Sequence, residues 1–328
     1  MSEPALAMFA ASRDLHATDR ESRTPRFAAF VASFDDAVEL RRLAENGYRW
    51  IGRSEAAFPA RLKAIHDPPP GIFLRGAAPD AIFARPAVSV VGARACSDYG
   101  AHVARSLSRE LAAAGVVVIS GLARGIDGWA HRGCLEAGGE TVAVLGCGID
   151  RDYPRAHAGL AREIGERGLL VAEYPPGVAP APWRFPARNR IVAGLALATV
   201  VVEARERSGA LITADLALEE GREVLAVPGE ITSALSQGAN ALLRLGATPV
   251  TCAADVLEAI GIEPPTSEPQ GPAAGTAAAS VLAAIEAGAS TVDQIARATG
   301  LTSGEAAGAL VELELDGRVE VKAGIYRR

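Results

Sequence analysis

The sequence predicts a mixed α/β protein: an extended Rossmann-like, doubly wound parallel sheet, preceded by a helical N-terminal cap and followed by a C-terminal winged-helix domain. Between residues 86 and 261, short apolar runs alternate with loops and amphipathic segments, which is the pattern of strands and helices wound around a parallel sheet. Two of these runs are rich in β-branched residues and end in small residues followed by an arginine. A proline-rich stretch at residues 263–272 then separates this pattern from the end of the chain.

The expected domains follow this division. Residues 1–75 form the N-terminal helical cap, because residues 27–44 show helical apolar spacing and a proline-rich turn follows at residues 68–71. Residues 76–261 form the Rossmann-like domain. Its expected strands are residues 88–93, 116–120, 141–145, 169–172, 199–203 and 224–227. Its expected helices begin near Asp98, Ile126, Arg155, Asn189, Leu211 and Asn240.

Residues 262–276 are predicted to be a linker, and residues 277–328 a winged-helix domain of three helices and a short hairpin. Ser290 and Thr302 are the expected N-caps of its second and third helices, and Glu305 completes a capping box with Thr302. The third helix carries four acidic side chains and no lysine or arginine between residues 303 and 316. Since DNA phosphates repel such a helix, a protein contact is favoured over the reading of a DNA groove.

The composition is that of a folded globular chain, with 49% hydrophobic residues and a net charge of −6. The apolar runs are too short to span a membrane, so a cytoplasmic location is expected. The four cysteines lack a Cys-x-x-Cys spacing, which favours reduced thiols over a metal site or disulfides. The acidic balance argues against a wholly basic nucleic-acid binder but permits a local basic groove.

Two predicted strand ends carry the first candidate site. Gly92 and Arg94 lie at the end of the first strand, and Ser120, Gly121 and Arg124 at the end of the second. Glycine lets a phosphate approach the backbone, arginine can hold it bidentately, and the N-terminus of the following helix attracts anions. Two such loops on neighbouring strands would form one anion-binding crevice. The alternative for each loop is a tight turn with a surface arginine.

A third candidate segment, residues 182–190, concentrates three arginines and two aromatic residues in a chain that is only 5% aromatic. Basic side chains beside aromatic platforms are typical of single-stranded nucleic-acid binding. The candidate site residues in this segment are Trp183, Arg184, Phe185, Arg188, Asn189 and Arg190. The alternatives are a proline-bent loop whose arginines pair with Glu173 or Glu203, or a division of the arginines between structure and ligand.

Ser208 and Gly209, in a charged loop before an expected helix, would add backbone donors to the crevice. The amide side chains within residues 236–240 suit sugar and base edges as well as turns and caps. Carboxylates near the strand ends, such as Asp127, suit acid–base catalysis, helix caps or arginine partners. Phosphate-loop, zinc-ligand and serine-hydrolase motifs are absent. We therefore expect a binding protein rather than an enzyme, with no cofactor and no metal ion.

The motifs that occur in order between residues 71 and 261 are VGAR, SGLARGID, VLGCGID, DYP, EYPPG, FPARNRIVAGL, EARERSGALITA, VPG and SQGAN. Through them the chain resembles the DNA-processing protein A family, DprA, also called Smf. The resemblance implies a cytoplasmic, dimeric protein of natural transformation that has no known catalytic activity. It also implies that the protein binds and protects incoming single-stranded DNA and loads the RecA recombinase onto it. The DNA-site positions that the resemblance carries over are Gly92, Arg94, Ser120, Gly121, Phe185, Arg188 and Arg190.

The chain departs from the family pattern in two places. Residues 182–184 are Pro-Trp-Arg where many members have a basic residue and a histidine, so one phosphate contact is expected to be replaced. Many members also have a sterile-alpha-motif-like N-terminal domain, but no helix-hairpin-helix glycine pattern precedes Ile51.

Two other protein classes share parts of this pattern. The alternative to a DNA-binding protein is a nucleotide-binding phosphoribohydrolase of the lysine-decarboxylase-like Rossmann class. Its Pro-Gly-Gly-x-Gly-Thr signature is absent, because Glu230 follows Pro228 and Gly229. A nicotinamide-dependent dehydrogenase would need Gly-x-Gly-x-x-Gly after the first strand, which this sequence lacks.

Overall fold

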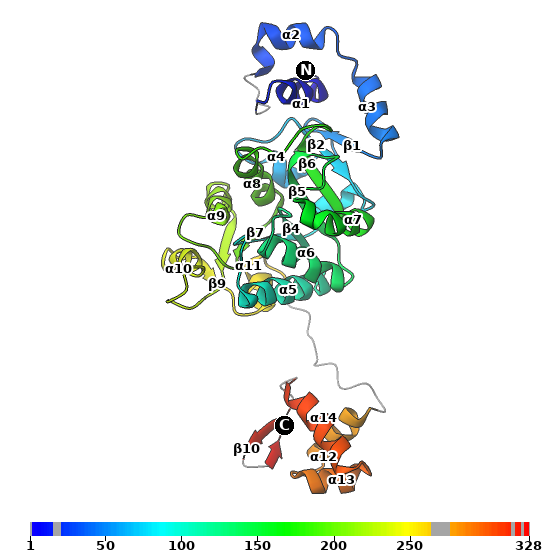
Figure 1. Ribbon diagram of the computed structural model, residues 1–328, viewed down its shortest axis with the longest axis vertical. Coiled ribbons are helices and arrows are strands. Elements are labelled where there is room, and N and C mark those ends of the chain that lie inside the picture. The colour runs from blue at the N-terminus through cyan, green and yellow to red at the C-terminus, as the bar shows by residue number, and fades with distance from the viewer. Residues whose placement is uncertain (1, 16–20, 264–275, 316–318, 323–324, 328) are drawn as a thin grey trace. The chain divides into compact units, whose positions relative to one another are not determined.

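The computed structural model describes residues 2–15, 21–263, 276–315, 319–322 and 325–327 (Figure 1). The chain forms two compact units, which divide between residues 264 and 265. The first unit holds a large sheet with its helices, and the second holds three helices and a hairpin. Within the described ranges, every helix is too short or too polar to cross a lipid bilayer.

The first unit alternates strands and helices along the chain (Figure 1). Its strands are β1 (Arg49–Gly52), β2 (Gly71–Arg75), β3 (Ala87–Val91), β4 (Val117–Ser120), β5 (Thr141–Gly148), β6 (Leu169–Tyr174), β7 (Ala198–Val201), β8 (Glu223–Ala226) and β9 (Thr248–Pro249). Its α-helices are α1 (Glu3–Ser12), α2 (Pro25–Val31), α3 (Asp36–Glu45), α4 (Ala60–Lys63), α5 (Asp98–Ala113), α6 (Ile126–Glu136), α7 (Ala158–Arg167), α8 (Arg184–Leu195), α9 (Gly209–Glu219), α10 (Gln237–Arg244) and α11 (Ala253–Ala259).

Nine strands of the described chain form one sheet in the order β1-β2-β6-β5-β4-β3-β7-β8-β9. The β1–β2 and β2–β6 pairs are antiparallel, and all the other pairs are parallel. From β3 the chain winds outward through β4, β5 and β6, and then continues on the other side of β3 through β7, β8 and β9. The strand order therefore reverses between β3 and β7, which is where open α/β sheets bind ligands. The expected doubly wound, mostly parallel sheet is confirmed.

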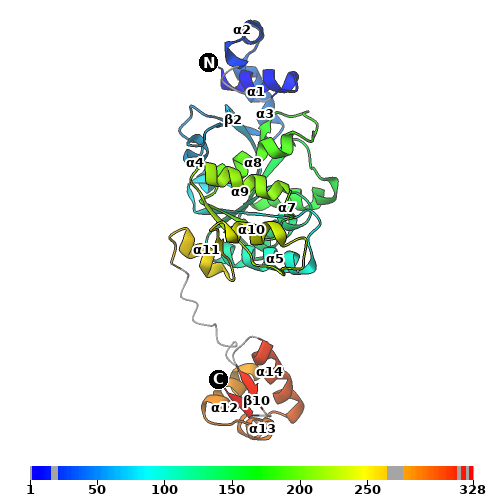
Figure 2. The same cartoon turned by 90° about the vertical axis from the view of Figure 1, so that its left-hand side faces the viewer.

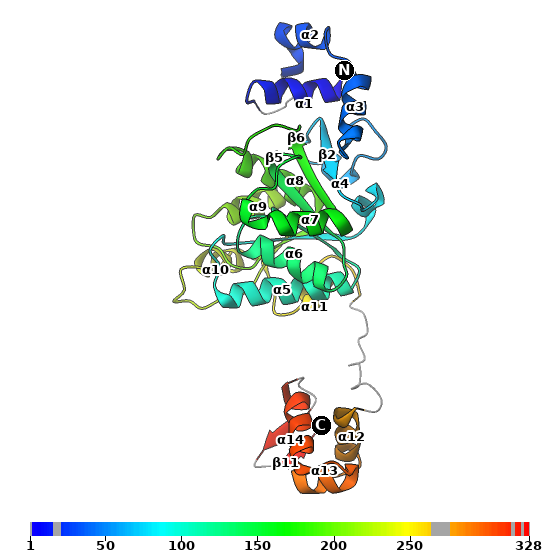
Figure 3. The same ribbon diagram turned by 45° about the vertical axis from the view of Figure 1, so that its right-hand side comes forward.

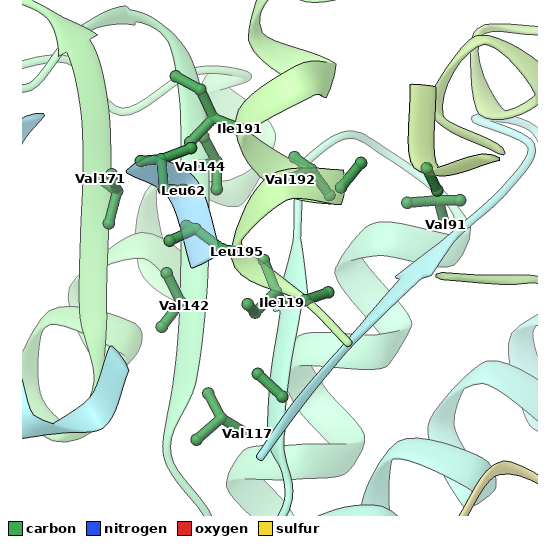
Figure 4. Packing of buried hydrophobic residues seen from close by; sticks show 14 of the residues in the cluster. Leu62, Val91, Val117, Ile119, Val142, Val144, Val171, Ile191, Val192 and Leu195 are labelled. Atoms are coloured by element: carbon green, nitrogen blue, oxygen red, sulfur yellow. The ribbon is translucent and has the colours of Figure 1, made fainter. Parts of the chain in front are cut away.

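Helices cover both faces of this sheet. Helices α4, α8, α9 and α10 pack on one face, and α5, α6, α7 and α11 pack on the other (Figure 2, Figure 3). Figure 4 shows Ile191, Val192 and Leu195 of α8 beside strand residues such as Ile119 and Val144. Both faces of the strands are apolar, because parallel strands between two helical layers are buried on both sides.

Residues 49–75 differ from the expected helical cap, because they contribute two strands to the edge of the sheet. β1 pairs with β2 in the register Trp50↔Phe73, and β2 pairs in turn with β6. The rings of Trp50 and Phe73 pack with their centroids 4.6 Å apart. Apolar runs this short do not distinguish a strand from a buried helical turn by periodicity. The helical part of the cap therefore ends with α3.

The N-terminus of α8 also differs from the expected one. The helix begins at Arg184, well before the expected start at Asn189. Pro186 is compatible with this start, because the N–H groups in the first turn of a helix have no partner within the helix. The aromatic and basic residues of the third candidate segment thus lie along the first turns of a helix and not in a loop.

The second unit consists of α12 (Ala277–Glu286), α13 (Val292–Thr299), α14 (Ser303–Leu315), β10 (Glu320–Lys322) and β11 (Ile325–Arg327) (Figure 3). Its core contains Val281, Ile285, Ile295, Leu310 and Leu313. The capping box is confirmed, since the Glu305 carboxylate accepts from the Thr302 N–H at 2.9 Å and the Thr302 hydroxyl at 2.7 Å. The N-cap of α13 is Thr291 and not Ser290. The Ser290 hydroxyl instead donates a hydrogen bond to Oε1 of Gln294.

Candidate nucleic-acid interface

The loops that follow β3 and β4 lie side by side at the carboxyl end of the sheet. Gly125 has φ of 74°, and a Cβ there would lie 2.7 Å from the carbonyl oxygen of Arg94, so only glycine fits between the loops. The Ile126 N–H donates to the Ala93 carbonyl at 3.2 Å. These contacts bring the loops that carry Arg94 and Arg124 together.

Leu122 anchors the loop between β4 and α6. Its φ of 59° is unusual for a residue with a side chain, and such conformations persist only where the surroundings enforce them. The Leu122 side chain is fully buried, and its carbonyl accepts a hydrogen bond from His157 Nδ1 at 3.0 Å. With Leu122 pointing inward, the next side chains, Ala123 and Arg124, face the solvent side of the loop.

Asp127 fixes the same loop from the first turn of α6. Its buried carboxylate accepts the N–H groups of Gly121 and Ala123 at 3.1 and 3.2 Å. The N-cap of α6 is Gly125, so Asp127 is not the cap that was one reading of the sequence. The N–H groups of Gly121 and Ala123 are consequently occupied by a carboxylate of the protein itself.

Arg188 forms the floor between the two loops and the sheet. Its side chain is buried, and Nη1 donates to the Gly121 carbonyl at 2.7 Å and to the Val144 carbonyl. Burial lowers the pKa of Arg188, and the charge of Asp127 opposes this shift. Burial raises the pKa of Asp127, and Arg188 opposes that shift together with the two N–H groups.

Two adjoining cavities open above this floor, with volumes of about 240 and 390 Å³. They share the walls formed by Arg94, Phe185 and Arg188. Most of the predicted site residues line one or both cavities: Gly92, Arg94, Gly121, Arg124, Phe185, Arg188, Asn189, Ser208 and Gly209. The first cavity lies between the β3 loop and the N-terminus of α9, which follows β7, and so occupies the point where the strand order reverses.

Arg94 and Arg124 are the cationic side chains at the rim of the second cavity. Both are exposed, and neither forms a hydrogen bond or ion pair with another described residue. The Arg94 guanidinium lies over the ring of Phe185, with Cζ 5.5 Å from the ring centroid. Both guanidinium groups are therefore available to hold an anion, in contrast to Arg188.

Phe185 lies among three groups at the boundary of the two cavities. Its ring stacks with Tyr153 at a centroid distance of 5.4 Å and an interplanar angle of 29°. A Cβ on Gly146 of β5 would lie 2.7 Å from Phe185 Cδ1, so the glycine allows the ring to rest directly against the strand. Arg94 lies over the same ring.

The N-terminus of α9 forms the far wall of the first cavity. Ser208 is its N-cap, and the Ser208 hydroxyl, although buried, has no partner among the described residues. A Cβ on Gly209 would meet nothing within 4 Å, so this backbone faces open space. The N–H groups of a first helical turn carry a partial positive charge and favour an anion. Asn189 ties α9 to α8 through the Gly209 carbonyl at 3.2 Å.

Two predicted site residues serve the sheet and its helix layer instead of the cavities. The Ser120 hydroxyl is fully buried and donates to the Val90 carbonyl at 2.7 Å. Arg190 is buried and forms a bidentate ion pair with Glu173 at 2.6 and 3.0 Å. It also lies 3.2 Å from the Asp67 carboxylate. Of the alternatives for the third segment, the structure shows the pairing with Glu173 for Arg190, while Arg188 lines the cavities but donates to backbone carbonyls.

Arg184 and Trp183 lie outside the two cavities as well. Arg184 is buried, pairs with Asp14 and donates to the Ala179 carbonyl. Its guanidinium lies between aromatic rings, with Cζ 5.1 Å from the Tyr174 centroid and 5.0 Å from that of Trp183. Trp183 is 37% exposed, packs edge-on against Tyr174 and lines neither of the two cavities.

The other polar groups named from the sequence are held by neighbours. The Asn240 amide bonds both backbone groups of Gly229, at 3.2 and 3.0 Å, and so closes a turn. The buried Glu203 carboxylate accepts the N–H and the hydroxyl of Ser97. All four cysteines are free thiols, and in the described ranges no cluster of three or more His, Cys, Asp or Glu side chains is placed to hold a metal ion.

Sequence reasoning did not select several residues that the structure places at the cavities. Tyr153, Pro154 and Ala123 line the second cavity, and Thr213 lines the first. Tyr153 carried a usable signal, because an aromatic side chain shortly after the end of a buried strand lies at the ligand-binding edge of a parallel sheet.

Comparison with protein-family models matches two segments of the chain. The DNA recombination-mediator protein A model matches residues 49–261, and the DprA winged helix domain model matches residues 263–324. The putative DNA processing protein DprA of Mycobacterium tuberculosis is 47% identical over 248 residues, which are 74% of this chain and 64% of the relative. The DNA processing protein DprA of Streptococcus pneumoniae is 46% identical over 204 residues, 61% of this chain and 70% of the relative. The match thus spans less than two thirds of the M. tuberculosis protein.

Solved structures agree with these sequence matches. The X-ray structure of S. pneumoniae DprA superposes with a TM-score of 0.67 at 40% identity, over 72% of this chain and 82% of that one. A structure of DprA from Helicobacter pylori, described by its single-stranded DNA binding mode, superposes with a TM-score of 0.58 at 28% identity, over 64% of this chain and 94% of that one. The expected resemblance is confirmed: the chain belongs to the DNA recombination-mediator protein A family, whose members are named DprA or Smf.

Proposed function

We propose that this protein binds single-stranded DNA during natural transformation, protects the incoming strand and loads the RecA recombinase onto it, in the cytoplasm and without catalysing a reaction. The observation that carries the proposal is the pair of adjoining cavities at the strand-order reversal, with Arg94 and Arg124 at their rim and unpaired within the described part of the chain. The H. pylori relative, whose structure is described by its single-stranded DNA binding mode, supports the same ligand.

The charges of the site suit a DNA backbone. The whole chain has a net charge of −6, so attraction to a polyanion depends on a local concentration of cations. Arg94 and Arg124 supply two free guanidinium groups, and the first turn of α9 supplies backbone donors. We therefore assign the phosphate contacts to these groups, in place of the Ser120 and Gly121 positions that the sequence suggested.

The aromatic wall of the cavities would bind DNA bases without distinguishing one base from another. The stacked rings of Phe185 and Tyr153 make one wall aromatic, and any base can stack on an exposed aromatic ring. The buried groups Arg188 and Asp127 are hydrogen-bonded to the protein itself. Binding is therefore expected to depend strongly on salt and weakly on sequence. Asp127 holds a loop and Glu173 pairs with Arg190, so the carboxylates of this region act as structural acceptors, which supports binding over catalysis.

A titration of a fluorescein-labelled thymidine oligonucleotide tests this proposal. Fluorescence anisotropy at two salt concentrations, beside a duplex of equal length, should show tight, salt-weakened binding of the single strand. Absence of binding at low salt would refute the proposal. The assay that then decides for the phosphoribohydrolase alternative is the release of free base from nucleoside monophosphates.

The partner assignments require separate measurements. We propose a homodimer, in which two DNA sites on one strand would raise the effective affinity. Sedimentation equilibrium measures the dimer directly, and a concentration-independent monomer mass contradicts it. For RecA loading, the rate of RecA filament growth on DNA already coated with a single-stranded DNA-binding protein should rise when this protein is added, and an unchanged rate contradicts the loading role.

A further inference from the structure

We infer that the second cavity is a nucleobase site, in which a base stacks on the exposed ring of Tyr153 while its phosphate occupies the first cavity. This inference rests on the proposed single-stranded DNA binding and specifies which ring and which cavity receive each part of a nucleotide.

The walls of the two cavities differ in their chemistry. The first, of about 240 Å³, has the N-terminus of α9, the unpartnered Ser208 hydroxyl and the open backbone at Gly209. These groups donate hydrogen bonds to an anion. The second, of about 390 Å³, is lined by Tyr153, Pro154 and Gly146, with arginines at its rim. An apolar, aromatic cavity with cationic edges suits a flat heterocycle better than a phosphate.

Tyr153 is the aromatic surface that a base can reach without rearrangement. Phe185 is already covered, because Tyr153 stacks on it and the Arg94 guanidinium lies over it, with Cζ 5.5 Å from the ring centroid. A base inserted between the Arg94 guanidinium and the Phe185 ring would need about 3.5 Å on each side, or about 7 Å in all. The distance between Arg94 Cζ and the ring centroid is smaller than this, at 5.5 Å. Tyr153 is 41% exposed and lines the second cavity.

Phe185 has the role of a support in this arrangement. Gly146 lets the Phe185 ring rest on β5, since a Cβ there would lie 2.7 Å from Cδ1. Tyr153 in turn rests on Phe185 at an interplanar angle of 29°. The base, Tyr153 and Phe185 would form a continuous stack, and Arg94 and Arg124 at the rim would neutralise the flanking phosphates.

The two proposed subsites adjoin each other through shared walls. Arg94, Phe185 and Arg188 border both cavities, so a base in one and a phosphate in the other lie on the two sides of the same side chains. Stacking is tolerant of sequence because each base has a π face, which keeps the site non-specific.

The test compares two strands and three proteins. Anisotropy measures binding of a short thymidine oligonucleotide and of an abasic strand with the same number of phosphates to the wild type, Tyr153→Ala and Tyr153→Phe. Tyr153→Ala should weaken binding of the thymidine strand about 5-fold to 100-fold. It should leave the abasic strand unchanged, and Tyr153→Phe should bind both strands as the wild type does. Tyr99→Ala removes another exposed tyrosine, outside both cavities, and is the matched control.

The outcomes separate the inference from the proposed function. Equal weakening of both strands by Tyr153→Ala, or no weakening of either, overturns the nucleobase site while single-stranded DNA binding stands. Failure of the wild type to bind either strand overturns the proposed function and the inference with it. A 2-aminopurine base in the thymidine strand adds a direct readout, because stacking on Tyr153 should quench its fluorescence in the wild type and not in Tyr153→Ala.

Discussion

Arg188 of α8 passes directly beneath Gly121, with Nη1 donating to the Gly121 carbonyl at 2.7 Å. A Cβ on Gly121 would lie 2.6 to 2.7 Å from three atoms of that guanidinium. The glycine is therefore needed here for space, because its φ is not in the left-handed region. This contact locks the β4 loop to α8 and so sets the shape of both cavities.

Gly121→Ala should therefore damage both stability and DNA binding. The methyl group forces Arg188 away from two carbonyl oxygens, and overpacking of this kind costs about 1–3 kcal/mol. Urea denaturation measures the free energy of unfolding, and anisotropy measures the affinity. Gly159→Ala is the control, since a Cβ at that helical position meets nothing within 4 Å. An unchanged DNA affinity in Gly121→Ala would show that the position of the β4 loop does not determine DNA binding.

Arg94→Ala and Arg124→Ala should weaken DNA binding without changing stability. Neither side chain has a hydrogen-bond or ion-pair partner among the described residues, so each removal costs little in the folded state. For single strands, each lost phosphate contact should reduce the slope of log K against log salt by about 0.7. Titrations at four salt concentrations measure this slope.

Arg109→Ala supplies the comparison for these variants, because Arg109 is exposed on α5 and lies outside both cavities. If Arg109→Ala lowers the slope as much as Arg94→Ala does, the attraction comes from overall charge and the two rim arginines have no special role.

The sheet was predictable wherever strands are buried on both faces. Strands β3 to β8 are apolar runs bounded by glycine, proline or polar residues, and this pattern has few alternatives. The edge strands β1 and β9 are short, and β2 joins the sheet antiparallel through β6, a pairing that depends on long-range contacts. Local periodicity carries no information about such a partner.

The residue types of the site were predictable, but the roles of its arginines depended on where α8 begins. Once the helix starts at Arg184, positions 184, 188, 191 and 195 fall on one face at helical spacing, and all four are buried. With the start placed at Asn189, Arg184 and Arg188 were assigned to a loop, where no spacing argument applies. Arg94 and Arg124, by contrast, lie in the loops before α5 and α6, and both are exposed.

Arg190 should contribute to stability and not to DNA contact. It is buried in a bidentate pair with Glu173, so Arg190→Ala removes the cation that balances a buried carboxylate and should cost about 3–5 kcal/mol. The double variant Arg190→Met, Glu173→Leu removes both charges and should recover most of that loss. Thermal unfolding and anisotropy of both proteins decide the matter: a stable double variant that has lost DNA affinity would place Arg190 in the binding site after all.

His131 should make the protein less stable as the pH falls below neutral. The side chain is fully buried on α6, Nδ1 bonds the Thr141 hydroxyl at 2.7 Å, and Nε2 has no partner among the described residues. Burial lowers the pKa of His131 to about 3, with the charges of His157, Arg132 and Arg188 acting in the same direction. An unfolded histidine titrates near pH 6.5, so the unfolded chain binds a proton that the folded one excludes between about pH 6.5 and 3.

The stabilising effect of neutral His131 is therefore complete above about pH 6.5 and is lost as the pH falls towards 3. Between pH 7.5 and 5.5 this group alone should lower the free energy of unfolding by about 1.4 kcal/mol. Urea denaturation at pH 7.5, 6.5 and 5.5 measures the loss in the wild type and in His131→Asn, whose amide can still bond Thr141. The loss should shrink by that amount in His131→Asn and stay unchanged when the exposed His102 is replaced by asparagine. An equal pH dependence in the wild type and in both variants would contradict this prediction. It would mean that His131 is protonated in the folded protein as it is in the unfolded chain, with Nε2 donating a hydrogen bond.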